Sequence, residues 1–388
     1  MSEVRGDSTG VAILGSTGSI GLQTLEVIDS LPERFRVLGI AAGHGAGACE
    51  AQLARYPEAH GWSPDGRPPG VDAARWCTDG LEGLATRDGV DLVVVATTGM
   101  AALPAVLAAL NAGRRVALAN KETLVTGGHL VAAALDRGTS DRLDRLRPID
   151  SEHSAIWQCL VGERIEDVER LVLTASGGPF RDRDAAGTAS VTPDEALAHP
   201  TWRMGPKVTI DSATLVNKAF EAIEARWLYR LPYSRIEAVI HPQSVVHSLV
   251  EFADGSFKAQ LGLPDMRLPI QYALTYPERL PSVARRSSPG EWGRLDFEPL
   301  TPGSFPAYDT VREAADAGGN RGAILNAADE VAVAAFLAGR IAFPAIADTI
   351  ARAIDRWGAA VEPTIDEITA LDAEVRTALG AELGVGVA

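Results

Sequence analysis

The N-terminal part of the chain repeats one pattern, a short apolar run followed by a helical stretch, and this repetition restricts the fold more than any other feature. Apolar runs at residues 11–14, 36–42, 90–96 and 116–119 have the length and composition of buried strands. Helical stretches separate them, notably residues 103–112. Strands that alternate with helices predict a doubly wound α/β domain with a largely parallel sheet.

A glycine-rich turn joins the first expected strand to the first expected helix. Its glycines are Gly15, Gly18 and Gly21, whereas the common dinucleotide fingerprint has the spacing G-x-G-x-x-G. Backbone amides at a helix N-terminus bind a pyrophosphate when no side chain obstructs them. An ordinary tight turn between a strand and a helix would use the same residues. Its position at the start of the βαβ series favours the nucleotide site.

The end of the second expected strand carries Gly43, His44 and Gly45, with no acid beside them. An Asp or Glu at this place would bond the ribose 2′-hydroxyl of NAD and repel the 2′-phosphate of NADP. Its absence favours NADP, with His44 as a contact to the phosphate.

Beyond residue 150 the pattern changes to that of a second sheet with helices. The expected elements are strands at residues 168–174, 238–241, 244–252 and 256–261, and helices at residues 154–160 and 213–229. Residues 176–205 are polar, contain glycine and proline, and have little core of their own, which is typical of a lid or of a disordered segment. We expect a nucleotide-binding domain over residues 1–150, a catalytic domain over 151–285, a linker over 286–307 and a helical domain over 308–388.

Composition narrows the class of protein. The 388 residues suffice for two or three domains, and 46% hydrophobic with 22% charged residues is ordinary for a globular protein. The formal net charge of −15 argues against nucleic acid as a partner. No apolar run approaches the length of a membrane span. Three cysteines without metal-type spacing, and an N-terminus without a signal-peptide core, indicate a cytoplasmic protein.

Two carboxylates stand close together after a strand-like run. Asp150 and Glu152 would project to the same side of an extended backbone, with Ser151 on the other. Carboxylate oxygens are hard ligands that suit Mg²⁺ or Mn²⁺ and are poor for zinc. The alternative is a helix N-cap followed by acids in the first turn.

A third carboxylate, Glu221, lies on an expected helix that starts near Ser212. Asn217, Lys218 and Glu221 share one side of that helix, opposite an apolar stripe. Read alone, they form a solvated face with a Lys–Glu contact. Read together with Asp150, Glu152 and the residues around His199, they indicate a metal-dependent, dinucleotide-using enzyme that acts on a small sugar phosphate.

Longer segments of the chain resemble the 1-deoxy-D-xylulose 5-phosphate reductoisomerase family. They are GSTGSIG (15–21), LANKE (118–122), PIDSEHSAIWQ (148–158), LTASGGPF (173–180), HPTWRMGPKVTIDSATLVNKAFEAIEA (199–225), HPQSVVHSLVEFADGS (241–256), PDMRLPI (264–270), LDFEPL (295–300) and NAADEVAVAAFLAGRI (326–341). The resemblance spans almost the whole chain. It implies conversion of 1-deoxy-D-xylulose 5-phosphate to 2-C-methyl-D-erythritol 4-phosphate, in the non-mevalonate isoprenoid precursor pathway, with NADPH and a divalent metal (Mg²⁺, Mn²⁺ or Co²⁺). It also implies a Rossmann-like domain, a catalytic domain with a lid, a C-terminal helical domain and a homodimer.

The resemblance also assigns roles to residues. The metal ligands would be Asp150, Glu152 and Glu221, and the catalytic set would add Lys121 and His199. Phosphate would be held by Ser176, Ser212, Asn217 and Lys218, and the remaining substrate contacts would be Lys121, Ser151, Glu152, His199, Trp202 and Glu221. The NADPH site would include Thr17, Gly18, Ser19, Ile20, Gly43, His44, Gly45, Asn120, Glu122, Gly205 and Met266. His199, Trp202 and Met204 would lie on the lid.

Three places depart from the family pattern. Gly45 stands where the family usually has asparagine, and residues 96–103 read ATTGMAAL in place of A-[IV]-V-G-x-x-G-L. Asp329 replaces the asparagine of N-A-A-N-E. Two other functions remain open: a sugar-phosphate or homoserine-type NAD(P) dehydrogenase without rearrangement, and a non-catalytic sensor that binds NADP(H) and a phosphate ligand.

Overall fold

The protein folds into two compact units. The computed structural model describes residues 8–43, 45–138, 141–183, 186–202 and 204–386. Unit 1 comprises Met1–Thr123, Val131–Ser154 and Asp265–Arg286, and unit 2 comprises Leu124–Leu130, Ala155–Pro264 and Ser287–Ala388. The C-terminal helices therefore share a unit with the central sheet. The four sequence segments expected as domains group the residues differently and stay a prediction.

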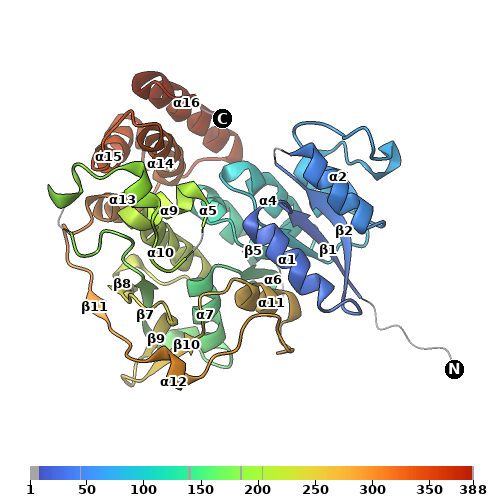
Figure 1. The fold of residues 1–388 in the computed structure, drawn as a ribbon, viewed down its shortest axis with the longest axis horizontal. Coiled ribbons are helices and arrows are strands. Elements are labelled where there is room, and N and C mark those ends of the chain that lie inside the picture. The colour runs from blue at the N-terminus through green and yellow to red at the C-terminus, as the bar shows by residue number, and fades with distance from the viewer. Residues whose placement is uncertain (1–7, 44, 139–140, 184–185, 203, 387–388) are drawn as a thin grey trace. The chain divides into compact units, whose positions relative to one another are not determined.

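Unit 1 is built on a six-stranded sheet in the order β3-β2-β1-β4-β5-β6, and every neighbouring pair in it is parallel. The strands are β1 (Thr9–Leu14), β2 (Phe35–Ala41), β3 (His60–Trp62), β4 (Leu92–Val95), β5 (Arg115–Leu118) and β6 (Leu146–Pro148). Their apolar side chains are buried because helices cover a parallel sheet. The expected doubly wound arrangement is confirmed (Figure 1).

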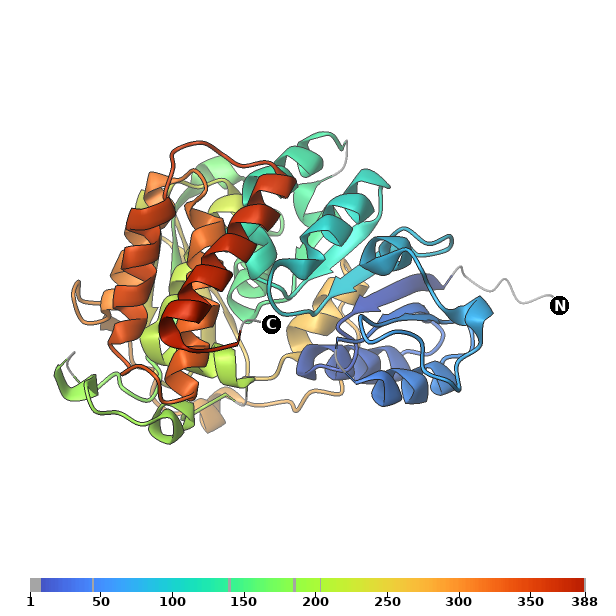
Figure 2. The same ribbon diagram turned by 90° about the horizontal axis from the view of Figure 1, so that it is seen from above.

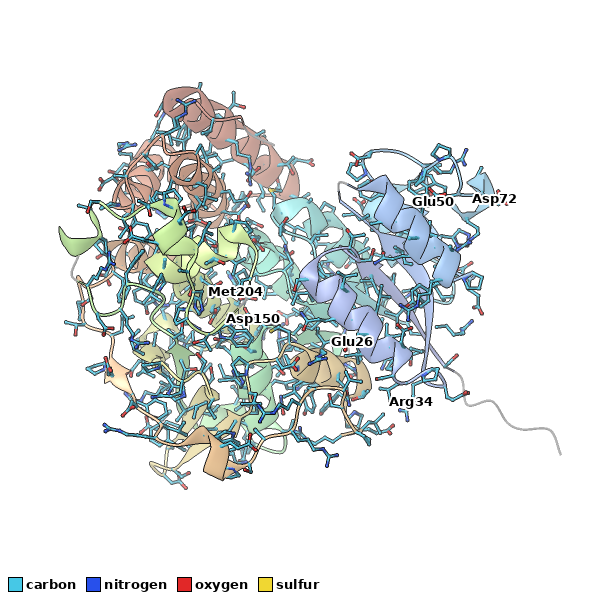
Figure 3. The ribbon with its side chains drawn as sticks, in the orientation of Figure 1. Glu26, Arg34, Glu50, Asp72, Asp150 and Met204 are labelled. Carbon is cyan, nitrogen blue, oxygen red and sulfur yellow. The ribbon has the colours of Figure 1, made fainter. Side chains whose placement is uncertain are left out.

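Helices connect the strands of this sheet. They are α1 (Ser19–Asp29), α2 (Ala46–Arg55), α3 (Gly80–Ala85), α4 (Leu103–Asn111), α5 (Glu122–Asp136), α6 (Arg142–Arg145) and α7 (Ser151–Leu160). The later helix α11 (Arg267–Thr275) returns to unit 1 and packs against α1. Arg267 of α11 forms an ion pair with Glu26 of α1 at 2.8 Å. Figure 3 labels Glu26 on α1. The boundary between the units runs through α5 and α7.

Unit 2 contains a five-stranded sheet in the order β10-β9-β7-β8-β11. The strands are β7 (Val168–Ala175), β8 (Ile236–Ile240), β9 (Val246–Phe252), β10 (Phe257–Leu261) and β11 (Glu298–Pro299). Only the β7–β8 pair is parallel. The four longer strands match the runs expected from sequence.

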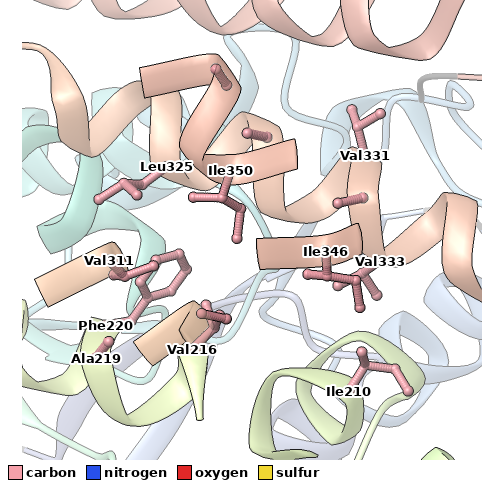
Figure 4. Close-up of a cluster of buried hydrophobic side chains, with 14 of the residues drawn as sticks. Ile210, Val216, Ala219, Phe220, Val311, Leu325, Val331, Val333, Ile346 and Ile350 are labelled. Atoms are coloured by element: carbon pink, nitrogen blue, oxygen red, sulfur yellow. The ribbon is translucent and has the colours of Figure 1, made fainter. Parts of the chain in front are cut away.

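Helices form the rest of unit 2. They are α8 (Pro193–Leu197), α9 (Pro206–Thr214), α10 (Val216–Tyr229), α12 (Pro289–Trp292), α13 (Pro306–Ala317), α14 (Arg321–Leu337), α15 (Ala345–Trp357) and α16 (Ile365–Leu383). Helices α14, α15 and α16 pack side by side (Figure 2). A single apolar cluster joins α9 and α10 to α13, α14 and α15 through residues such as Ile210, Phe220, Val311 and Ile350 (Figure 4). The C-terminal helices therefore form the wall against which α9 and α10 are fixed.

Two local expectations were wrong. The helix expected over residues 213–229 is two helices, because Leu215 adopts a left-handed conformation with φ of 58° between α9 and α10. Asp150 and Glu152 do not lie on extended backbone, since α7 begins at Ser151 and places Glu152 in its first turn. The structure instead has the alternative arrangement, a helix start with an acid in its first turn. Within the described ranges, none of the helices combines the length and the hydropathy that crossing a bilayer requires.

Candidate active-site residues

The three glycines of the turn between β1 and α1 differ in how closely other atoms approach them. Gly15 has φ of 89°, and a Cβ on it would lie 2.4 Å from the carbonyl oxygen of Ala96. A Cβ on Gly21 would lie 2.3 Å from the carbonyl oxygen of Gly15. Gly18, by contrast, is exposed and uncrowded, and α1 begins after it without a side-chain cap. The first amides of α1 are therefore accessible to an anionic ligand.

The loop after β2 contains a carboxylate that the local sequence does not reveal. Gly43 and Gly45 are exposed, and a Cβ on either would meet no atom within 4 Å. The backbone N–H of Gly45 donates to Asp65 Oδ2 at 3.1 Å. The expectation that this loop has no nearby acid was therefore wrong, because Asp65 reaches it from the segment after β3. His44 lies outside the described residues.

Asn120 and Glu122 hold the start of α5. Both are buried, and the Asn120 amide donates to the Glu122 carboxylate at 3.0 Å. The same amide donates to the carbonyl oxygens of Thr97 and Gly99 at 3.0 and 2.9 Å. Asn120 thus ties the end of β5 to the atypical loop after β4. The cofactor role expected for this pair stays a prediction.

A lysine and a carboxylate meet at the carboxyl ends of β5 and β6. These two strands are parallel, with Leu118 opposite Pro148, so the residues that follow them lie together. Lys121 Nζ lies 2.9 Å from Asp150 Oδ2, and both side chains are largely buried. Ser151 Oγ donates to Glu152 Oε2 at 2.6 Å. The carboxyl edge of a parallel sheet is the usual ligand site of a doubly wound domain.

In unit 2, three side chains expected to hold the substrate come together. His199 Nε2 lies 3.0 Å from Ser176 Oγ and 3.1 Å from Ser212 Oγ. Ser176 follows β7, His199 follows α8, and Ser212 lies in the last turn of α9. The fold therefore gathers three neutral hydrogen-bonding groups from segments up to 36 residues apart.

The protonation of His199 follows from its other ring nitrogen. The backbone N–H groups of Thr201 and Trp202 donate to His199 Nδ1 at 3.1 and 2.9 Å. A nitrogen that accepts two such bonds carries no proton, so the neutral ring carries its proton on Nε2. Burial lowers the pKa of His199 from its ordinary value, which favours the neutral ring. His199 is therefore a neutral donor directed at the two serines.

Gly178 allows the loop after β7 to approach α9. Its φ is 64°, and a Cβ on it would lie 2.7 Å from the carbonyl oxygen of Ser212. Its N–H donates to Ser176 Oγ at 3.2 Å. A side chain at this position would separate Ser176 from Ser212, so the sequence Ser-Gly-Gly is a requirement of the site's geometry.

The first turns of α10 carry Asn217, Lys218 and Glu221. The Asn217 amide donates to Glu221 Oε1 at 2.5 Å, and the Lys218 ammonium forms an ion pair with Glu221 Oε2. Lys218 and Glu221 are 3% and 1% exposed. The reading of these residues as a solvated face was therefore wrong, since buried charges of this kind persist only when paired.

The motifs resemble the reductoisomerase family, and sequence models of that family match most of the chain. The model of 1-deoxy-D-xylulose 5-phosphate reductoisomerase matches residues 11–60 and 73–128, and models of its C-terminal domain match residues 146–229 and 261–378. The chain belongs to this reductoisomerase family. A relative from Pelotomaculum thermopropionicum is 48% identical over 372 residues, which are 93% of this chain and 95% of the relative. One from Geobacillus kaustophilus is 47% identical over 377 residues, 94% and 97% of the two chains.

Solved structures of the family have the same fold. A crystal structure of DOX-P reductoisomerase in complex with NADPH, fosmidomycin and magnesium superimposes with a TM-score of 0.89 at 36% identity, covering 97% of this chain and 98% of that one. The enzyme from Zymomonas mobilis in complex with NADPH gives 0.87 at 38% identity, covering 97% and 99%. The expected fold class is confirmed.

The other residues that the family resemblance assigns to the site lie near α9 and α11. Trp202 lies with its ring 6.2 Å from the ring of His247. Gly205 precedes α9 with open space around it, and Met266 precedes α11. The segment 176–205 contributes more buried apolar side chains than expected, because Phe180, Val191 and Ala196 belong to the apolar cluster of unit 2.

The donor sets fit the groups that the family uses. Asp150, Glu152 and Glu221 offer carboxylate oxygens only, the ligand type of Mg²⁺ and Mn²⁺. The uncrowded glycines at positions 18, 43 and 45 leave space for a dinucleotide to approach the backbone.

Proposed function

We propose that this protein converts 1-deoxy-D-xylulose 5-phosphate to 2-C-methyl-D-erythritol 4-phosphate, with NADPH as reductant and a divalent metal. The observation that carries the proposal lies within unit 2. There the neutral donors Ser176, His199 and Ser212 precede a helix that bears Lys218 and the buried carboxylate Glu221. Phosphate donors close to a helix that carries a metal-type ligand suit a phosphorylated substrate that is also chelated.

Asp150, Glu152 and Glu221 would hold the metal. When bound, such a metal supplies Lewis-acid polarisation of the substrate carbonyl and an adjacent hydroxyl. Relatives support the group, because a solved family structure contains magnesium. The donor set, which lacks histidine and cysteine, supports a hard cation.

The protein's own side chains would bind and orient the substrate. Ser176, Ser212 and Asn217 would donate to phosphate oxygens, and Lys218 would supply the one full positive charge. His199 would hold the two serines so that their hydroxyl protons remain available to the phosphate. A dianion held by several neutral donors and one ammonium is well matched in this way.

Lys121 and Ser151 would contact the substrate hydroxyls near the carboxylates. Trp202 would cover the reacting carbons and exclude water when the segment between α8 and α9 closes. NADPH would lie with its pyrophosphate at the accessible amides at the start of α1. Solved family members in complex with NADPH support the cofactor itself. The homodimer and the cytoplasmic location expected from the sequence stay predictions.

Oxidation of NADPH tests the proposal first. We expect NADPH to be oxidised only when 1-deoxy-D-xylulose 5-phosphate and Mn²⁺ or Mg²⁺ are both present, and oxidation to stop when a chelator removes the metal. A dehydrogenase without rearrangement would reduce a simple ketone in the chelator. A sensor would bind NADPH and phosphate without any turnover.

A further inference from the structure

Lys207 lies between two buried carboxylates in unit 2. It stands in the first turn of α9, and its Nζ is 2.6 Å from Asp211 Oδ2 on the same helix. The same Nζ is 2.7 Å from Asp329 Oδ2 on α14. Asp211 and Asp329 are 1% and 0% exposed. Asp329 is the residue that departs from the family's asparagine.

The charges of this cluster do not balance if both carboxylates are ionised. One ammonium would face two carboxylates in a place without solvent, which is costly. Glu330, the next residue on α14, is itself paired with Arg376 of α16 at 2.8 Å, and Arg376 also bonds Asp372 at 2.6 Å. That arginine already has two acidic partners, so it supplies no spare charge. A single proton shared by Asp211 and Asp329, whose side chains hydrogen-bond to each other, restores the balance.

The direction in which the pKa of Asp329 shifts agrees with this charge count. Burial raises the pKa of Asp329 above its ordinary value, and the neighbouring Glu330 raises it further, while Lys207 and Asp211 act in the opposite sense. The protonated carboxyl can still accept from Lys207 through its carbonyl oxygen.

The cluster adjoins one of the proposed phosphate donors, because Asp211 immediately precedes Ser212. The Lys207–Asp329 contact joins α9, the helix that carries Ser212, to α14. Lys207 Nζ also lies 5.1 Å from the centroid of the Phe220 ring on α10. Phe220 and Ile210 belong to the apolar cluster that includes α14 (Figure 4). One ammonium therefore contacts all three helices.

We propose that Lys207 and Asp329 are positioning residues for the phosphate donors, and that Asp211 and Asp329 together hold one proton beside the Lys207 ammonium. The contact between α9 and α14 holds Ser212, and through the turn at Leu215 the start of α10, at the place where a phosphate is bound. This inference rests on the proposed function for the identity of the bound group. Family members with asparagine at this position would make the same contact without the proton.

The first test compares Asp329→Leu with Glu330→Gln, a matched change on the same helix that faces Arg376. We expect Asp329→Leu to raise the KM for the sugar phosphate about tenfold, because displaced donors bind it less well. The KM for NADPH should not change in either variant, and Glu330→Gln should leave both constants unchanged. Equal effects of the two variants, or an unchanged sugar-phosphate KM in Asp329→Leu, would overturn the positioning role.

Binding of inorganic phosphate, followed by calorimetry, gives the same comparison without turnover. Weaker phosphate binding in Asp329→Leu alone supports the positioning role even if the protein does not catalyse the proposed reaction. Unchanged phosphate binding overturns the role, whatever the outcome for catalysis.

The second test uses Asp329→Asn and does not depend on the leucine variant folding. A carboxyl whose folded pKa is raised binds a proton that the unfolded chain loses, so the wild type loses stability as pH rises. We expect the melting temperature of Asp329→Asn relative to wild type to increase from about pH 5 to about pH 8. A difference between the two proteins that does not change with pH would overturn the shared proton.

Discussion

Glu221 illustrates how a single residue combines burial with charge. Its two carboxylate oxygens bind the side chains of Asn217 and Lys218, which lie about one turn earlier on α10. A carboxylate buried in this way is held at a fixed place, which is what a ligand of a small, geometrically demanding cation requires.

Replacement of this carboxylate should remove metal-dependent turnover. We expect Glu221→Gln to lower kcat by at least about 100-fold and to weaken metal binding, because a neutral amide is a poor ligand for a hard cation. NADPH affinity, measured by fluorescence titration, should stay close to that of the wild type. A variant that keeps its turnover and its metal affinity would show that Glu221 is not a ligand.

His199 should remain neutral with its proton on Nε2 at neutral pH. Two backbone donors occupy Nδ1, and burial lowers the pKa. A His whose folded pKa is depressed contributes stability that is present above the ordinary value of about 6.5 and lost as pH falls below it. Long-range ¹⁵N NMR at pH values around 7 should show the Nε2–H tautomer, and an imidazolium or Nδ1–H signal would contradict this assignment.

Substitution of His199 provides a second readout. Glutamine can place an N–H near the position of Nε2, whereas phenylalanine cannot. We therefore expect His199→Phe to raise the KM for the sugar phosphate about tenfold and His199→Gln to raise it less.

Asp65 should weaken the binding of NADPH. Its carboxylate lies against Gly45 after β2, where a doubly wound domain binds the adenosine ribose. We expect Asp65→Asn to lower the KM for NADPH about threefold and to leave that for NADH unchanged, because a negative charge repels the 2′-phosphate through partly screened solvent. The two cofactors compared in both proteins give the answer, and an equal change for both would remove Asp65 from cofactor selection.

At this scale the sequence predicts residue types better than their surroundings. Ser176, His199 and Ser212 could be chosen from the motifs, and the structure brings them together. Asp65 could not, because it reaches Gly45 from 20 residues away through tertiary structure. The consequence of Asp329 was equally hidden, since its partner Lys207 lies 122 residues earlier.

At the scale of elements, substitutions in the loop after β7 test whether the close approach of this loop to α9 is needed for substrate binding. Gly178 and Gly255 both have positive φ, 64° and 83°, but only Gly178 is crowded, by the carbonyl oxygen of Ser212. We expect Gly255→Ala to cost about 1–2 kcal/mol of stability without changing any KM. Gly178→Ala should cost about 2–4 kcal/mol and raise the KM for the sugar phosphate.

Thermal unfolding and steady-state kinetics on the two alanine variants decide the point. If both variants raise the KM equally, or if Gly178→Ala leaves it unchanged, the approach of this loop to α9 is not needed for substrate binding.

The break between α9 and α10 shows where periodicity stops being informative. Residues 211–221 contain no glycine or proline, so the local sequence predicts one continuous helix. Leu215 instead takes a left-handed conformation and is 2% exposed. Burial of its side chain outweighs a backbone cost of about 1–2 kcal/mol. The start of α7 was missed for a related reason, because a strand end and a helix start share the residues 148–152.

At the scale of the whole molecule, the residues with proposed roles are divided between the two compact units. Lys121, Asp150 and Ser151 belong to unit 1, whereas Ser176 and Glu221 belong to unit 2. The alternation of strands and helices predicted the doubly wound sheet of the first unit, but not the return of α11 to that unit. The C-terminal helices are joined to α9 and α10 by an apolar cluster, in which Phe220 and Val331 lie more than 100 residues apart, and no local pattern reveals such a contact.

The net charge of −15 is compatible with an anionic substrate only through local structure. Lys218 and the neutral donors of unit 2 supply a binding place that global charge does not describe. The net charge therefore argues against nucleic acid as a partner, but it does not exclude a sugar phosphate as the substrate.

The carbon skeleton of the product tests the central claim most directly. Incubation with ¹³C-labelled 1-deoxy-D-xylulose 5-phosphate, NADPH and Mn²⁺, followed by NMR, distinguishes rearrangement from simple reduction. We predict the branched 2-C-methyl-D-erythritol 4-phosphate, with one NADPH oxidised for each product molecule formed. An unbranched polyol phosphate, or product formed at the same rate in a chelator, would contradict the account.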